Sequence, residues 1–89
     1  MNDAIELCRE ALPDAQAFRD AARQAATALA APGGPVEAAK LDEHQFALHG
    51  YAWMATYVTA LEQLLGWAER LDGESRFSDL ERLILSCGF

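Results

Sequence analysis

The sequence predicts an all-α protein, a small bundle of three to four helices around one long central helix. First, apolar residues between positions 45 and 71 recur at alternating four- and three-residue spacings, which is typical of a helix. Second, a proline- and glycine-rich stretch at 31–35 separates two long segments with this helical spacing. Third, Ser78 and Glu81 form an S-x-x-E signature that predicts the start of a short last helix.

The central helix is predicted over residues 36–71 and carries two adjacent apolar seams. The first seam comprises Phe46, Gly50, Trp53, Tyr57, Ala60, Leu64, Trp67 and Leu71. The second seam, one residue later, comprises Ala47, Tyr51, Met54, Val58, Leu61, Leu65 and Ala68. Two adjacent rows form an apolar arc wide enough to face two neighbouring helices. We therefore expect this helix to lie between others, with its aromatic side chains filling the core.

The first helix is predicted over residues 3–31, with Asp3 as its cap and Glu6 completing a capping box. Pro13 removes a backbone donor, so a break or kink is expected there. The apolar phase continues unbroken past this position, which favours one kinked helix over two separate helices. That phase comprises Ile5, Cys8, Leu12, Ala15, Phe18, Ala22, Ala25 and Leu29. The opposite face, expected in solvent, holds Gln16, Arg19, Asp20, Arg23, Gln24 and Thr27.

The second half of the first helix is rich in alanine, from Ala21 to Ala31. Small side chains let a neighbouring helix approach closely and leave room for large side chains opposite, so the aromatic residues of the central helix are expected to fill this space. Pro32, Gly33, Gly34 and Pro35 then predict a short turn that makes the two long helices antiparallel neighbours.

The last helix is predicted over residues 79–87. Its apolar residues, expected to face the core, are Leu80, Leu83, Ile84 and Cys87. The chain then ends with Gly88 and Phe89, and a glycine followed by an aromatic residue resembles a helix end that leads into another element. We therefore expect residues 1–89 to form a single helical domain that is the N-terminal piece of a longer protein.

The composition excludes several classes of partner. Seven basic and fourteen acidic residues give a net charge of −7, and no basic patch is present that could bind nucleic acid or an anionic membrane. The best membrane-spanning candidate, 45–61, is slightly short and contains several polar residues. Charged residues near the N-terminus exclude a signal peptide, so a cytoplasmic protein is expected. Cys8 and Cys87 are expected to be reduced thiols, although a disulfide between them stays open.

The sequence assigns no catalytic, cofactor-binding or metal-binding residue. His44 and His49 are five residues apart and cannot share a metal ion from one face of a helix. Glu62 and Glu69 are seven apart on the polar face, where a hydrated surface is more common than an acid–base pair.

Five aromatic residues are candidates for a packing or docking surface: Tyr51, Trp53, Tyr57, Trp67 and Phe89. The spacing of the first four favours core packing, because both seams continue with leucine, valine and alanine. Exposure of Trp53 or Tyr57 to solvent would instead indicate a surface that docks on a partner.

Two stretches, HGYAWMATYVTALEQLLGWAERL at 49–71 and FSDLERLILSCGF at 77–89, resemble the N-terminal helical extension of acyl-CoA dehydrogenases of the methylsuccinyl-CoA dehydrogenase type. The resemblance implies a parent flavoenzyme that uses FAD to oxidise an acyl-CoA thioester at its α and β carbons. It also implies that the catalytic glutamate and the FAD and CoA contacts lie downstream, in the dehydrogenase body. No catalytic residue or FAD site is therefore carried over to this segment.

The resemblance thus implies an accessory helical domain that covers the dehydrogenase body or its oligomer surface. The alternative is a free-standing acidic interaction module whose seams pair with another helical subunit in a homo-oligomer. An open reading frame beyond the codon of Phe89 would support the first hypothesis, and a stop codon there the second.

Overall fold

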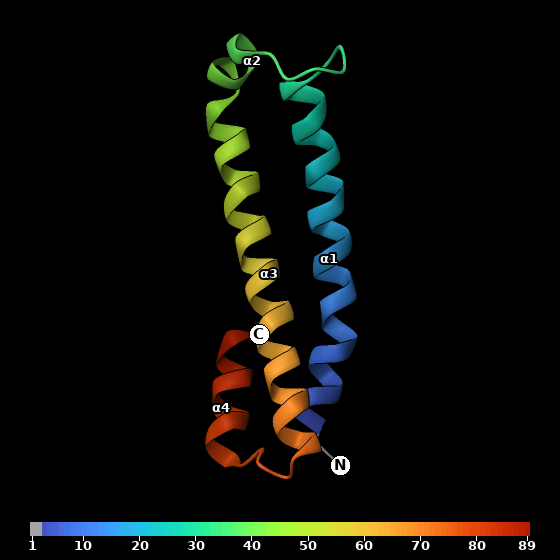
Figure 1. Ribbon diagram of the computed structural model, residues 1–89, viewed down its shortest axis with the longest axis vertical. Helices are drawn as coiled ribbons and strands as arrows, with labels where there is room; N and C mark the ends of the chain where they lie inside the picture. The colour runs from blue at the N-terminus through green and yellow to red at the C-terminus, as the bar shows by residue number, and fades with distance from the viewer. Residues whose placement is uncertain (1–2) are drawn as a thin grey trace.

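The computed structural model describes residues 3–89, and all the regular secondary structure of this range is helical. The elements are α1 (Asp3–Ala30), α2 (Ala38–Glu43), α3 (Gln45–Gly73) and α4 (Asp79–Gly88). Helices α1 and α3 lie side by side along most of their length, and α4 turns back along the end of α3 (Figure 1). The prediction of an all-α helical bundle is confirmed.

Helix α1 passes through Pro13 without interruption, but the apolar phase predicted for it is wrong in its middle. Phe18 is 65% exposed, whereas Arg19 is half-buried and ion-paired with α3. A strict seven-residue repeat from the buried Ile5 leads through Arg19 to the buried Ala26. The prediction placed Phe18 on the packed face because it is apolar, but the row that faces α3 passes through the next residue, Arg19.

The predicted helix 36–71 is divided in the structure. His44, with φ −109° and ψ 23°, separates α2 from α3, and its backbone N–H donates to the carbonyl of Lys40. None of the residues of α2 is buried, so no packing keeps this segment in line with α3. The turn before α2 matches its prediction, because Gly34 adopts a φ of 105°, which side chains disfavour.

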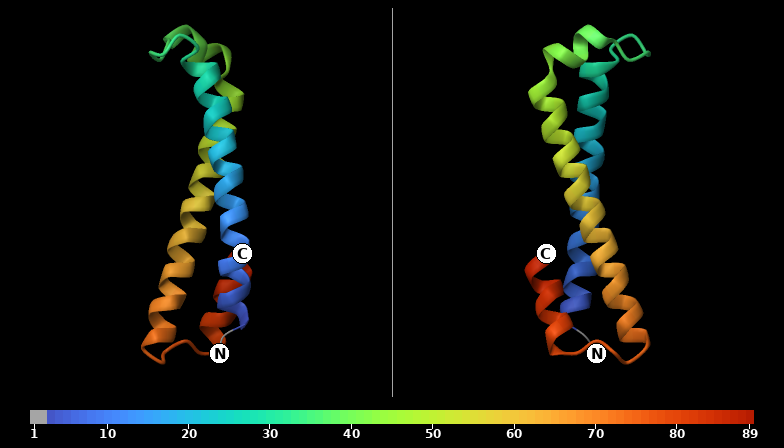
Figure 2. Two further views of the ribbon diagram at one scale, coloured as in Figure 1. Left: turned by 90° about the vertical axis from the view of Figure 1, so that its right-hand side faces the viewer. Right: turned by 60° about the vertical axis from the view of Figure 1, so that its left-hand side comes forward.

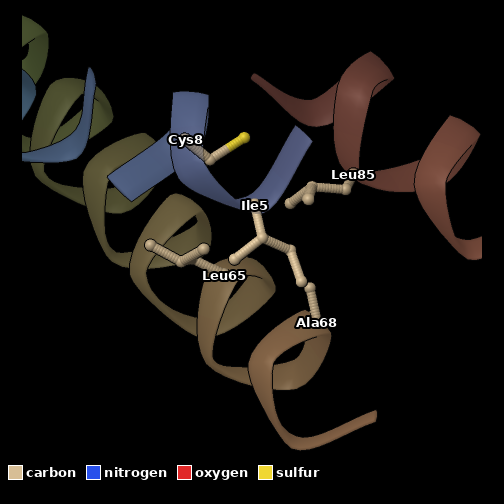
Figure 3. Packing of buried hydrophobic residues seen from close by; sticks show 5 residues of the cluster. All are labelled: Ile5, Cys8, Leu65, Ala68 and Leu85. Atoms are coloured by element: carbon tan, nitrogen blue, oxygen red, sulfur yellow. The ribbon is translucent and has the colours of Figure 1, made fainter. Parts of the chain in front are cut away.

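The core lies at the end of the molecule where three helices meet. Ile5 and Cys8 of α1 pack there with Leu65 and Ala68 of α3 and with Leu85 of α4 (Figure 3). Partly buried hydrophobic residues surround this cluster, namely Ala4, Leu12, Leu64, Trp67 and Phe77. The buried residues of α3 all belong to the second seam, so this seam is the one that packs on α1.

Helix α4 begins with the predicted capping box of Ser78 and Glu81, in which the backbone N–H of Ser78 donates to the Glu81 carboxylate at 3.1 Å. The prediction of which face of this helix packs on the core is wrong, because Leu85 is buried instead of the predicted residues. Exposed residues of α4 include Leu80, Leu83, Ile84 and Cys87. Apolar residues occupy more than one face of this short helix, so the pattern did not determine which face turns inward.

The molecule is long and thin, with extents of 52 × 18 × 16 Å. Its radius of gyration is 17.1 Å, against about 12 Å for a compact chain of this length. Its accessible surface is 6142 Å², against roughly 5,100 Å² expected for a globular protein of this mass. Over the half of the molecule remote from α4, no third helix of residues 3–89 runs along α1 and α3, and the short α2 lies only at their far end (Figure 2). This half exposes apolar surface that a compact fold would bury.

Candidate docking surface

The two long helices are joined along one edge by polar contacts that the sequence did not predict. Arg9 Nε donates to Glu69 at 2.6 Å, and Gln16 Nε2 donates to Glu62 at 2.7 Å. Arg19 Nη1 also reaches Glu62, at 3.3 Å. The hydrogen bonds that Arg9 donates to Glu69 and Glu6 raise the pKa of its guanidinium. Glu62 and Glu69 are therefore bound to α1, and both Gln16 and Arg19 lie beside α3 instead of on the free face expected for them.

Three aromatic side chains of the first seam lie open to solvent. Phe46 is 94% exposed, Trp53 52% and Tyr57 63%. These residues, together with Gly50 between them, are called the aromatic face below. The expectation that Trp53 and Tyr57 fill the core is thus wrong. The reason is the length of α4, which covers the first seam only at its lower end.

The aromatic face has an ordered internal arrangement. Trp53 Nε1 donates a hydrogen bond to His49 Nε2 at 2.7 Å, and the two rings meet edge to face with centroids 6.0 Å apart. The Trp53 and Tyr57 rings are 5.8 Å apart and tilted by 31°. Rings four residues apart along a helix support one another in this way. The indole N–H is thus satisfied within the helix, and the exposed part of this ring offers apolar contact alone.

Helix α4 covers the C-terminal part of the first seam, from Leu64 to Leu71. Gly88 of α4 lies so close to Leu64 that a β-carbon added to it would collide with the leucine side chain. Trp67 and Leu71, further down the seam, are half-buried. The first seam is therefore covered from Leu71 back to Leu64, and it is exposed from Tyr57 to Phe46.

Beside the aromatic face, an open hollow of about 330 Å³ lies between α1 and α3. It is lined mainly by small residues and is called the alanine groove below. Its lining consists of Ala22, Ala25, Ala26, Leu29, Ala47, Gly50, Tyr51 and Met54. None of these residues is charged. The space that the alanines were expected to leave exists, but the aromatic residues of α3 do not fill it.

The five predicted surface residues fall into two groups. Tyr51 lines the alanine groove, with Trp53 and Tyr57 on the neighbouring aromatic face. Trp67 packs against the core, and Phe89 caps the C-terminal end of α4. Sequence reasoning missed Phe18, which lies one heptad before the groove residue Ala25 and so on the same side of α1.

Reactive side chains are dispersed over residues 3–89. Nowhere in this range do three His, Cys, Asp or Glu residues gather closely enough to hold a metal ion. Cys8 and Cys87 are free thiols, and burial raises the pKa of Cys8. In the same range, none of the helices combines the length and hydropathy that crossing a bilayer requires.

The chain is similar to a (2S)-methylsuccinyl-CoA dehydrogenase. It is 40% identical over 89 residues to this protein of Cereibacter sphaeroides, which covers all of the chain and 16% of the relative. No protein-family model matches the chain. The resemblance first based on residues 49–71 and 77–89 is confirmed, and it extends over the first helix as well. The match is consistent with an N-terminal segment of an acyl-CoA dehydrogenase.

Proposed function

We propose that this chain is the accessory N-terminal helical domain of a cytoplasmic, FAD-dependent acyl-CoA dehydrogenase, and that its function is to dock on the dehydrogenase body. The observation that carries the proposal is the exposed aromatic face, on a chain similar along its whole length to one sixth of a dehydrogenase. Contiguous exposed apolar surface on a small domain is typical of interaction sites. The domain contributes stability or assembly, and the chemistry takes place elsewhere.

The FAD of the proposed parent enzyme does not fit the hollows of this chain. FAD carries a diphosphate, which needs cationic or N–H donors. The alanine groove is lined by alanine, leucine, glycine, tyrosine and methionine, and the two hollows beside His49 offer no Lys or Arg. We therefore assign the flavin and the acyl-CoA to the dehydrogenase body.

A second candidate function is a free-standing module that forms a homo-oligomer. Two antiparallel helix pairs can associate as a four-helix bundle, and the open half of α1 and α3 offers the necessary apolar surface. The net charge of −7 opposes this association, because each added copy brings the same charge.

The proposal is tested in a full-length enzyme. The matching segment of the Cereibacter relative is replaced by this chain, and the chimera is compared with the relative and with a version that lacks the segment. We expect small-angle scattering to show the domain packed on the body, and the shortened enzyme to keep its flavin but melt at a lower temperature. A domain that moves independently of the body would contradict docking. A stable dimer of the isolated chain would support the second candidate.

A further inference from the structure

Helix α4 demonstrates how a third helix binds to the α1–α3 pair. Its Leu85 points toward Ile5 and belongs to the same buried cluster as Cys8, Leu65 and Ala68 (Figure 3), and its backbone at Gly88 approaches Leu64 closely. The C-terminal end of α4 lies beside the middle of α3 and is directed toward the open half of the pair (Figure 1).

The surface of α3 that α4 contacts continues along α3 into the half of the molecule that α4 does not reach. Tyr57 and Gly50 precede Leu64 by one and two heptads, so all three lie along one side of α3. Gly50 also lines the alanine groove, and a β-carbon added to it would meet nothing within 4 Å. The surface that α4 covers near Leu64 is thus continuous with the alanine groove and the aromatic face.

The dimensions of this open surface suit a helix. From Leu64 to Ala47 is 17 positions, or about 25 Å at 1.5 Å per residue, so a helix of roughly the same number of residues would fill the length. The alanines of α1 permit a close approach of the helix axes. Trp53 and Tyr57 would then flank such a helix on its α3 side.

The charge distribution selects the kind of partner. No Asp, Glu, Lys or Arg occurs between residues 45 and 61, although the chain as a whole carries a net charge of −7. A partner for this surface needs an apolar stripe and gains nothing from ionic side chains. A second copy of the chain would bring a further −7, which opposes close association.

We propose that the alanine groove and the aromatic face receive one amphipathic helix of the dehydrogenase body, lying on the line of α4 with its apolar stripe toward Gly50 and Tyr57. This inference rests on the proposed function and deepens it by naming the contact surface and the secondary structure that it binds. The bound helix completes, in the upper half, the three-helix packing that α4 provides in the lower half.

The test uses the isolated chain and the full-length chimera, with hydroxyl-radical footprinting of Trp53 and Tyr57. Both rings are expected to be modified readily in the isolated chain and at least about tenfold more slowly in the chimera. Scattering of the same chimera reports independently whether the domain is docked.

Two glycines of α3 supply a matched pair of variants. Gly50→Leu places a side chain in the alanine groove, whereas the β-carbon of Gly66→Leu meets only the Arg70 side chain, at 3.7 Å. Both changes replace glycine by a better helix former, so both isolated variants are expected to fold. In the chimera, Gly50→Leu should restore rapid modification of Trp53, and Gly66→Leu should leave it protected.

The outcomes separate the two proposals. A docked domain whose Trp53 and Tyr57 remain as reactive as in the isolated chain would overturn this inference and leave the proposed function intact. An undocked domain would overturn both. Protection that arises in the isolated chain at raised concentration, and disappears with Gly50→Leu, would assign the surface to a second copy and also overturn the inference.

Discussion

The two ends of the α1–α3 pair have similar seam spacings and opposite exposure. At the lower end, Ile5, Leu65 and Leu85 are buried, whereas at the upper end Phe46, Trp53 and Tyr57 are largely in solvent. The difference is the third helix, which covers only the lower end. An apolar row thus indicates that a neighbour can bind there, and the fold decides whether this chain supplies that neighbour.

The largest expected effect is the loss of the lower core. Leu85→Ala removes a fully buried side chain at the junction of three helices, and it should destabilise the isolated chain by about 2–5 kcal/mol. Tyr57→Ala, on the exposed aromatic face, should change the stability by less than about 0.5 kcal/mol. Urea unfolding followed by circular dichroism measures both. Equal losses would mean that the two ends do not differ as described.

The two cysteines should report the same contrast between a closed and an open environment. Cys8 lies in the lower core, where burial raises its pKa and reduces the reactive thiolate, whereas Cys87 is exposed on α4. We expect an alkylating reagent to modify Cys87 at least about tenfold faster than Cys8 at neutral pH. Mass spectrometry of peptides taken over time measures the two rates. Similar rates would show that α4 does not close the core.

A smaller difference is expected between the two tryptophans. Trp53 is half-exposed on the aromatic face, whereas Trp67 packs against the core. In the single-tryptophan variants Trp67→Phe and Trp53→Phe, the remaining Trp53 should emit at longer wavelength and be quenched more strongly by acrylamide than the remaining Trp67. His49→Ala should increase the quenching of Trp53 further, because its hydrogen bond to the indole is lost. Identical quenching of both tryptophans would contradict this assignment.

The smallest expected effect concerns the start of α4. The hydrogen bond from the Ser78 side chain lowers the pKa of Glu81. A carboxyl group with a lowered pKa in the folded state stabilises that state above its unfolded pKa, and this contribution is lost as the pH falls through the folded pKa. Acidification below about pH 4.5 should therefore weaken α4 slightly, and Ser78→Ala should reduce this dependence, because it removes the largest cause of the lowered pKa. Thermal melts across this pH range provide the measurement, and an unchanged pH profile in Ser78→Ala would contradict it.

Local signals in the sequence were sufficient for much of this fold. The capping box at Ser78, the turn at Gly34 and the second seam could all be predicted, because each depends on residues close together in the chain. The rows of α1 and α4 that face other helices could not be predicted in this way. Arg19 occupies a contact position next to the more apolar Phe18, and Leu85 is buried instead of Leu83, since only the tertiary packing decides between adjacent rows.

From the sequence, the aromatic residues of α3 could be assigned either to the core or to an exposed surface, but not to one of the two. Trp53 and Tyr57 have the same spacing as the half-buried Trp67, so no pattern distinguishes a core residue from a docking residue. Which aromatic residues are covered depends on how far α4 extends along α3. This can be read only from the structure, in which α4 ends beside Leu64.

The break at His44 has a mechanical consequence. Helix α2 has no buried residue and meets α3 through a non-helical position, so its orientation depends on local contacts such as the Lys40–Glu43 ion pair at 3.1 Å. The three-helix junction begins at Leu65, which is 21 positions from His44, so a change in the direction of α2 would leave the lower core intact.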